Sequence, residues 1–190
     1  MAMQIAVLGA GAFGTALAIQ LARRGNPTQL WGRNASALQN MGTQRVNQRY
    51  LPGCRFPESL QVEADLERAV ATADTLLVAT PSHALGAILE TLKPLVSTRQ
   101  RIACACKGLE PGSSRLPHEV AQAVLGDPRA FAVISGPTFA KELGLGLPTA
   151  VTVASQVPGF ARSLAEALHG DGFRAYTTDD VTGVEIGGAC

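Results

Sequence analysis

The sequence predicts an α/β fold in which helices cover both faces of a mostly parallel β-sheet. Short apolar runs alternate with segments of helical periodicity along the whole chain, and this alternation is typical of parallel strands joined by crossover helices. The chain is 46 % hydrophobic and only 5 % aromatic, a composition that suits buried parallel strands and packed helices. Its 190 residues suffice for one domain with a substantial core and are few for two.

Short runs rich in Val, Ile, Leu and Ala, bounded by Gly, Pro or polar residues, are the expected strands. In chain order they cover residues 4–9, 28–32, 60–63, 75–80, 101–106, 130–135, 149–154 and 175–177. Helices are expected over residues 13–24, 35–46, 65–72, 83–93, 116–125 and 159–169, and from residue 179 onward. Asn34 and Ser82 are suited to cap the helices that follow them, and residues 52–57 are expected to form a loop.

The junction between the first strand and the first helix contains three glycines in the pattern Gly-x-Gly-x-x-Gly. Gly9 permits a tight turn, Gly11 lets the backbone approach a pyrophosphate, and Gly14 lets the helix pack closely on the strand. The N–H groups and the dipole of the helix N-terminus would then face the negative charge. The junction predicts a dinucleotide site, and a glycine-rich turn that binds nothing is the alternative.

Residues 5–21 are almost wholly apolar, so a signal peptide and a membrane span are also considered. A signal peptide needs a positive segment before its apolar core, but the first basic residues, Arg23 and Arg24, come after the run. A span needs about 18 consecutive apolar residues, whereas three glycines, Thr15 and Gln20 interrupt this run. We therefore expect no membrane insertion.

Charge and cysteine content narrow the function classes further. Sixteen basic and 15 acidic residues give a net charge of +1, which gives no indication of a nucleic-acid partner. Cys104 and Cys106 lack the two-residue gap of most zinc and thioredoxin-like motifs. On a strand both thiols would face one side and pack as small apolar groups, with metal or redox use as the alternative. Reduced cysteines and no targeting segment favour the cytoplasm.

Ligands of such sheets bind at the carboxyl ends of the strands, so the residues that follow each strand are candidates. After the second strand stands Arg33, where a site that prefers NAD usually has an acid. Because an arginine accommodates a 2′-phosphate, NADPH is favoured over NADH. A solvated surface arginine is the alternative.

Two later strand ends carry further candidates. Lys107 can place a cation over a phosphate or a carbonyl, beside a glycine that lets the backbone pass closely. Residues 135–142 end another strand and open a helix that Thr138 is suited to cap, whose N–H groups form a second candidate anion site. Ordinary turn chemistry explains each loop equally well on its own. Because both loops are expected on the same sheet edge as the glycine pattern, they strengthen one another as candidate binding loops.

These motifs resemble the bacterial NAD(P)-dependent glycerol-3-phosphate dehydrogenase family. The matching segments follow the family's order along essentially the whole chain: residues 9–16, 30–32, 81–83, 107–110, 133–142, 146–150 and 183–189. The most specific are Ser-Gly-Pro-Thr-Phe-Ala and Lys-Gly-Leu-Glu. The resemblance implies a Rossmann-like, doubly wound fold. It also implies reversible hydride transfer between NAD(P)H and dihydroxyacetone phosphate, giving sn-glycerol 3-phosphate for glycerophospholipid synthesis.

The resemblance also implies roles for particular residues. Besides the fingerprint glycines Gly9, Gly11 and Gly14, it places these residues at cofactor-contacting positions: Ala12, Phe13, Arg33, Lys107 and Ala140. It places Lys107, Gly136 and Thr138 at the glycerol-phosphate site, in agreement with the expected cation and helix N-terminus on one sheet edge.

The end of the chain departs from the family. There a Gly-Gly-Ala stretch is followed, after one apolar residue, by the catalytic Lys and an Asn, whereas here Cys190 takes the apolar place and is the last residue. The resemblance therefore implies that residues 1–190 are a cofactor-binding domain with no catalytic residue of their own. A C-terminal helical domain, with other substrate contacts and much of a homodimer interface, would be absent. We expect the chain to bind cofactor and to be nearly inactive alone.

Two other functions remain open. The first is another dehydrogenase with this N-terminal domain, such as a ketopantoate reductase or a sugar-nucleotide dehydrogenase, against which residues 135–142 argue. The second is a non-enzymatic nicotinamide-binding module, which would have little need for the loops at residues 107–110 and 135–138.

Overall fold

The computed structural model describes residues 2–126 and 131–189. Its strands are β1 (Ile5–Leu8), β2 (Thr28–Trp31), β3 (Val46–Asn47), β4 (Leu51–Arg55), β5 (Leu60–Glu63), β6 (Thr75–Val78), β7 (Arg101–Cys104), β8 (Phe131–Ser135), β9 (Thr149–Ala154) and β10 (Phe173–Thr178). Its helices are α1 (Ala12–Arg23), α2 (Ala35–Gln44), α3 (Leu66–Ala71), α4 (Leu85–Leu92), α5 (Pro117–Leu125), α6 (Ala140–Leu145), α7 (Pro158–Leu168) and α8 (Val181–Ala189), with a 3₁₀ turn η1 (Ser82–Ala84).

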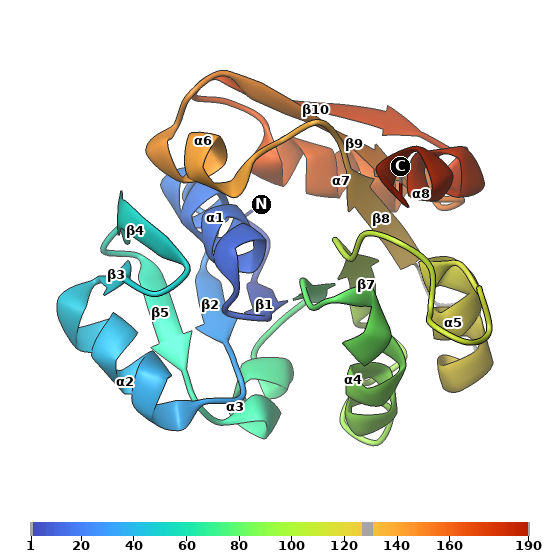
Figure 1. The fold of residues 1–190 in the computed structure, drawn as a ribbon, viewed down its shortest axis with the longest axis horizontal. Helices are drawn as coiled ribbons and strands as arrows, with labels where there is room; N and C mark the ends of the chain where they lie inside the picture. The colour runs from blue at the N-terminus through green and yellow to red at the C-terminus, as the bar shows by residue number, and fades with distance from the viewer. Residues whose placement is uncertain (1, 127–130, 190) are drawn as a thin grey trace.

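Eight strands form one sheet in the order β10-β9-β8-β7-β6-β1-β2-β5 (Figure 1). Neighbouring strands are parallel except β8 and β9, which pair antiparallel. From β1 the chain moves outward through β2 to β5, and then returns to the other side of β1 with β6. The strand order thus reverses between β1 and β6, where ligands bind in doubly wound sheets. The predicted fold class is confirmed.

The two faces of the sheet carry separate apolar cores. Ile5 and Val7 of β1 belong to the core that α1, α6 and α7 cover, whereas Ala6 and Leu8 belong to the core under α3, α4 and α5 (Figure 1). This alternation follows from the two-residue period of a strand. Because both faces are buried, β1 is wholly apolar rather than alternating.

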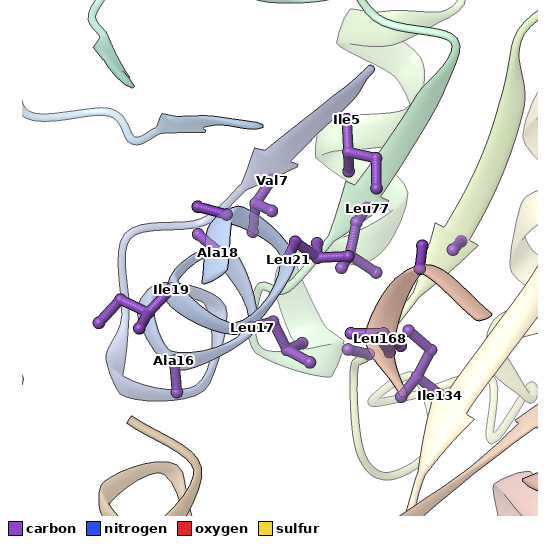
Figure 2. Packing of buried hydrophobic residues seen from close by; sticks show 14 of the residues in the cluster. Ile5, Val7, Ala16, Leu17, Ala18, Ile19, Leu21, Leu77, Ile134 and Leu168 are labelled. Atoms are coloured by element: carbon purple, nitrogen blue, oxygen red, sulfur yellow. The ribbon is translucent and has the colours of Figure 1, made fainter. Parts of the chain in front are cut away.

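Helix α1 packs against the middle of the first core. In Figure 2, Leu21 of α1 points toward Leu77 of β6, and Leu17 points toward Leu168 of α7. Residues 14–22 of α1 are all buried, since sheet, α6 and α7 surround the helix. The almost continuous apolar run of the sequence therefore reflects a core helix. Among the described residues, no helix combines the length and the apolar character that crossing a bilayer requires.

The segment after α2 differs from the expectation. The helix was expected to reach residue 46 and residues 52–57 to form a loop, but α2 ends at Gln44 and β3 and β4 form an antiparallel hairpin. Arg45 adopts a left-handed conformation (φ 55°) and ends the helix. Leu51 and Cys54 of β4 are buried in the core of α1 and α6, so tertiary packing draws this segment into strands.

Two expected helix caps are also wrong. Thr138 does not cap α6, whose N-cap is Phe139, because the Thr138 hydroxyl bonds to β9 instead. Ser82 lies inside η1 rather than before a helix, and its side chain caps nothing. Asn34 does cap α2, accepting a bond from the Ala37 N–H at 2.9 Å. The expected strand start at Ala130 lies outside the described residues, as does Cys190.

Candidate functional site

The turn from Gly9 to Gly14 joins β1 to α1 at the point where the strand order reverses. Gly9 has φ +134°, and a Cβ there would lie 2.3 Å from the Ala79 carbonyl oxygen at the end of β6. A Cβ on Gly14 would lie 2.0 Å from the Gly9 carbonyl oxygen. Both separations are too short for real atoms, so the close packing of strand, turn and helix requires glycine at these two positions.

Gly11 is different because the protein itself does not require a glycine there. Its φ is −77°, which any residue adopts, and a Cβ would meet no atom within 4 Å. Gly11 is the N-cap of α1, and the Thr15 N–H makes the first helical bond, to the Gly11 carbonyl at 3.0 Å. The N–H groups of Ala12, Phe13 and Gly14 consequently lack intrahelical acceptors. Open space beside free N–H donors suits a phosphate group.

Asn47, which contacts the glycine turn, was not predicted from the sequence. Asn47 of β3 is fully buried and donates from Nδ2 to the Ala10 carbonyl at 3.0 Å and to Thr15 Oγ1 at 2.8 Å. Its Oδ1 accepts a bond from the Tyr50 N–H at 3.2 Å. Sequence reasoning missed Asn47 because it was placed just beyond an expected helix, and no local motif marks a contact across 37 positions of the chain.

Arg33 follows β2, and its side chain is exposed. Within the described part of the chain it makes no hydrogen bond or ion pair, so its guanidinium is available to an external anion. Ala140 begins α6, and both it and Phe13 are half-buried against the core that α1 and α6 share. The contacts of these residues with a cofactor remain predictions.

A cavity of about 530 Å³ lies beyond the carboxyl ends of β7 and β8. Its lining is Lys107, Ser135, Gly136, Pro137, Thr152, Val184, Gly187, Gly188 and Ala189. The exposed Lys107 donates from Nζ to the Gly136 carbonyl at 3.0 Å, so two residues of the expected substrate site meet here. An ammonium has three donors, which leaves two for a ligand in a cavity of small-molecule size.

Thr138, the third residue expected to contact substrate, does not line this cavity. Its hydroxyl lies 2.9 Å from Thr149 Oγ1 and also donates to the Ala150 carbonyl, and its N–H donates to the Gly136 carbonyl at 2.8 Å. A Cβ at Gly136 would lie 2.7 Å from the Ala150 carbonyl oxygen. Thr138 and Gly136 therefore hold the turn after β8 tightly against β9. A direct contact between Thr138 and substrate remains a prediction.

Helix α8 forms one wall of the cavity and is held by a buried carboxylate. Glu185 accepts a hydrogen bond from the His118 N–H at 2.8 Å, and its second oxygen lies 2.5 Å from His118 Nδ1. The Glu185 side chain is 1 % exposed, and this burial raises its pKa above the ordinary value despite the contacts with His118. The first turn of α5 thereby fixes the position of α8.

The loop after Lys107 is braced by a half-buried ion pair between Arg115 and Glu110. Glu110 Oε2 accepts bonds from Arg115 Nε at 3.0 Å and Nη2 at 2.8 Å, and from the Ser113 hydroxyl. These bonds, Ser113 foremost, hold the pKa of Glu110 below its usual value. Cys104 and Cys106, which precede this loop, are buried in the second core, as their spacing predicts.

The chain resembles known proteins over most of its length. Residues 4–161 match the family described as NAD-dependent glycerol-3-phosphate dehydrogenase N-terminus. Glycerol-3-phosphate dehydrogenase [NAD(P)+] of Stenotrophomonas maltophilia (strain R551-3) is 54 % identical over 186 residues, which are 98 % of this chain and 54 % of that protein. The protein of the same name from Shewanella baltica (strain OS185) is 50 % identical over 186 residues, 97 % of this chain and 55 % of that protein.

The chain also resembles solved structures. The glycerol-3-phosphate dehydrogenase of Coxiella burnetii superposes with a TM-score of 0.93 at 44 % identity, over 98 % of this chain and 57 % of that chain. The UDP-D-ManNAc dehydrogenase of Pyrococcus horikoshii has a TM-score of 0.78 at 14 % identity, over 97 % of this chain and 48 % of that chain. This second likeness shows the fold alone.

The chain thus spans about half the length of the curated relatives that it matches. The match begins at residue 4 in the family's N-terminal region, and it includes the glycine turn, Lys107 and the turn at Gly136. The sequence motifs predicted this family, and the comparisons confirm the prediction. The chain belongs to the NAD(P)-dependent glycerol-3-phosphate dehydrogenase family and corresponds to its N-terminal part.

Proposed function

We propose that this chain binds NADPH or NADH and is the cofactor-binding half of an enzyme that interconverts dihydroxyacetone phosphate and sn-glycerol 3-phosphate. The observation that carries the proposal is the open space at Gly11, beside the N–H groups of Ala12, Phe13 and Gly14, at the reversal of strand order. Family membership supports the substrate assignment, and the Lys107 cavity lies at the same edge of the sheet.

In this proposal each part of the site has its own task. The turn from Gly9 to Gly14 binds the pyrophosphate, and Phe13 and Ala140 line the space beside it. The bound nicotinamide supplies the hydride. Lys107 orients the small phosphorylated substrate and stabilises negative charge on its carbonyl oxygen. Thr138 and Gly136 shape the turn on which the substrate rests.

The remaining parts of the proposal concern the full-length enzyme. Residues 1–190 form the NAD(P)-binding domain, and a C-terminal helical domain supplies the catalytic lysine and further substrate contacts. The full-length enzyme is a cytoplasmic homodimer that requires no nucleic acid. Arg33, with no acid beside it in the sequence, favours NADPH over NADH.

Two measurements test this function. The first is fluorescence titration of the 190-residue chain with NADPH and NADH, and the second is turnover of dihydroxyacetone phosphate by this chain and by a version extended through a relative's C-terminal half. We expect cofactor binding by both proteins and turnover by the extended one, with ketopantoate as an unreactive control. Binding of neither nucleotide would overturn the cofactor assignment, and preferential reduction of ketopantoate would overturn the substrate assignment.

A further inference from the structure

The side-chain amide of Asn47 uses three hydrogen bonds, and two of them hold the glycine turn. Nδ2 donates to the carbonyl of Ala10 and to Oγ1 of Thr15, which stand on opposite sides of Gly11 in the sequence. Asn47 is 0 % exposed, so water does not compete for these bonds. A single side chain from a distant hairpin thereby spans the turn.

The Ala10 carbonyl matters because of its place in the turn. A carbonyl oxygen carries partial negative charge, and one that faced the open space at Gly11 would repel a phosphate group. The bond from Asn47 occupies this carbonyl at 3.0 Å, and on the other side a Cβ at Gly32 would lie 2.9 Å from Ala10 Cβ. Ala10 is therefore confined between the end of β2 and Asn47.

Asn47 is itself held in place by the hairpin that carries it. The Tyr50 N–H donates to its Oδ1, and Leu51 and Cys54 of β4 are buried against α1 and α6. A Cβ on Gly144 of α6 would lie 2.7 Å from Cys54 Sγ, so the hairpin fits closely against that helix. The amide group is thus a fixed point rather than a mobile surface contact.

We propose that Asn47 is a positioning residue for dinucleotide binding, an inference that rests on the proposed cofactor function. It keeps the Ala10 carbonyl turned away from the anion site and ties the turn to the first helical bond of α1. The N–H groups of Ala12, Phe13 and Gly14 are then pre-oriented toward the pyrophosphate, and no reorganisation of the turn is required on binding.

Asn47→Asp tests this role, because it keeps the size of the side chain and its Oδ1 acceptor but removes both donors. The chain offers a matched control in Asn26, which is 6 % exposed. Asn26 donates from Nδ2 to the carbonyls of Leu21 and Ala167 and accepts from the Met3 N–H. It precedes β2 at the edge opposite the glycine turn, so Asn26→Asp makes the same chemical change away from the site.

Two readouts are needed for each variant of the 190-residue chain. The first is amide hydrogen exchange of residues 9–15 without ligand, and the second is the Kd for NADPH beside that for adenosine 2′-monophosphate, which has no pyrophosphate. For Asn47→Asp we expect exchange in this segment to be about tenfold faster and the Kd for NADPH about tenfold higher. Adenosine 2′-monophosphate should bind both variants like the parent chain, and Asn26→Asp should leave residues 9–15 and NADPH binding unchanged.

Equal effects of Asn47→Asp and Asn26→Asp, or an unchanged Kd for NADPH in Asn47→Asp, would overturn the positioning role. If Asn47→Asp fails to fold, Thr15→Val removes only one acceptor at nearly constant volume. It should then quicken exchange of residues 9–15 by about threefold, and no change would overturn the proposal. Failure of the parent chain to bind either nucleotide would overturn the proposed function alone, because the exchange measurement needs no ligand.

Discussion

Three glycines of one motif meet two different requirements at the residue scale. Gly9 and Gly14 are fixed by the protein's own packing, since a Cβ on either would overlap a backbone carbonyl oxygen. Gly11 has an ordinary φ of −77° and free space around it, so the packing of the protein does not require glycine there, and the proposed pyrophosphate would occupy that space. Effects on folding and on cofactor binding can therefore be separated by substitutions at Gly14 and Gly11 of the same turn.

Gly14→Ala should mainly lower stability, whereas Gly11→Ala should mainly weaken NADPH binding. Gly14→Ala forces a shift in the packed junction, and we expect a loss of about 1–3 kcal/mol in the free energy of unfolding. Gly11→Ala should cost at most about 1 kcal/mol as a poorer N-cap, yet it should raise the Kd for NADPH at least about tenfold. Urea unfolding and fluorescence titration measure the two quantities. A Gly11→Ala variant that bound NADPH normally would contradict the assignment of the open space to pyrophosphate.

Arg33→Asp tests the nucleotide preference. The substitution replaces an unpaired guanidinium by a carboxylate that repels a 2′-phosphate and can bind ribose hydroxyls. The Kd for NADPH should rise by about tenfold or more, while the Kd for NADH changes by less than about threefold. Arg99→Asp, an equal change of charge in the loop before β7, serves as the control for long-range electrostatics. Equal losses for both nucleotides would refute the 2′-phosphate assignment.

The sequence predicted the glycine turn, which a local motif marks, but it did not predict the tertiary contacts that hold the turn. Gly9, Gly11 and Gly14 are found from their spacing alone. Asn47 was missed because its two bonds connect segments that only folding brings together. Thr138 was expected to cap a helix because of its position in the sequence. In the fold its hydroxyl instead bonds to a carbonyl and a hydroxyl of β9, and a single sequence does not show that β9 lies beside it.

At the scale of elements, a buried carboxylate links α8 to α5. Glu185 makes the polar contact with His118, and Val181 and Val184 of α8 pack against a cluster that includes Val133 and Ala154. Since α8 supplies Gly187 and Gly188 to the cavity wall, anything that weakens this link should widen the cavity. The titratable groups near Glu185 are His118 and Glu119 of α5 and the Cys104 thiol of β7.

Glu185→Gln should change how stability depends on pH. Burial raises the pKa of Glu185 in the folded state, so the fold binds this proton more tightly than the unfolded chain does. Protonation of Glu185 therefore contributes to the free energy of unfolding. This contribution is complete below the pKa of the unfolded chain, about 4.3, and is lost as pH rises through the raised pKa of the folded state. Glutamine keeps an acceptor for the His118 N–H without the buried charge. The free energy of unfolding of the variant, relative to the parent, should therefore increase as pH rises above about 4.

Urea unfolding across this pH range measures the effect, and Glu166→Gln on the exposed side of α7 is the control. A pH profile for Glu185→Gln that runs parallel to the parent's would show that Glu185 does not titrate with folding. A profile like that of Glu166→Gln would lead to the same conclusion.

Elements were predictable where their periodicity was strong. The wholly apolar β1 and the buried α1 were found with bounds close to the observed ones. The hairpin of β3 and β4 was not predicted, because the exposed Pro52 and Gly53 separate the buried Leu51 and Cys54 and break the two-residue period of a strand. Pro52, Gly53 and Pro57 also give the segment the composition of a loop. The segment forms a hairpin because Leu51 and Cys54 are buried against α1 and α6, and this burial depends on the tertiary fold and not on the local sequence.

For the whole molecule, the proposed cofactor should act as a stabilising ligand. A nucleotide that binds only the folded chain stabilises it by RT ln(1 + [L]/Kd), which is about 2.7 kcal/mol at a hundredfold excess over Kd. NADPH at that excess should raise the free energy of unfolding of the 190-residue chain by this amount. The gain should be smaller for Gly11→Ala at the same NADPH concentration. Thermal or urea unfolding with and without nucleotide measures it, and no gain for the parent chain would contradict cofactor binding.

Within the eight-stranded sheet that the described residues form, β8 and β9 are the one antiparallel pair, and this pairing sets the direction of the chain after β10. Because β9 and β10 are antiparallel to the other strands of the sheet, β10 ends at the sheet edge opposite the glycine turn. Helix α8 then runs back alongside β8. It starts near Val133 and Ala154 and arrives at Ser135, where a Cβ on Gly188 would lie 2.1 Å from the serine oxygen. One reversal of strand polarity thus brings the last turn of α8, with Gly187 and Gly188, to the cavity that Lys107 also lines.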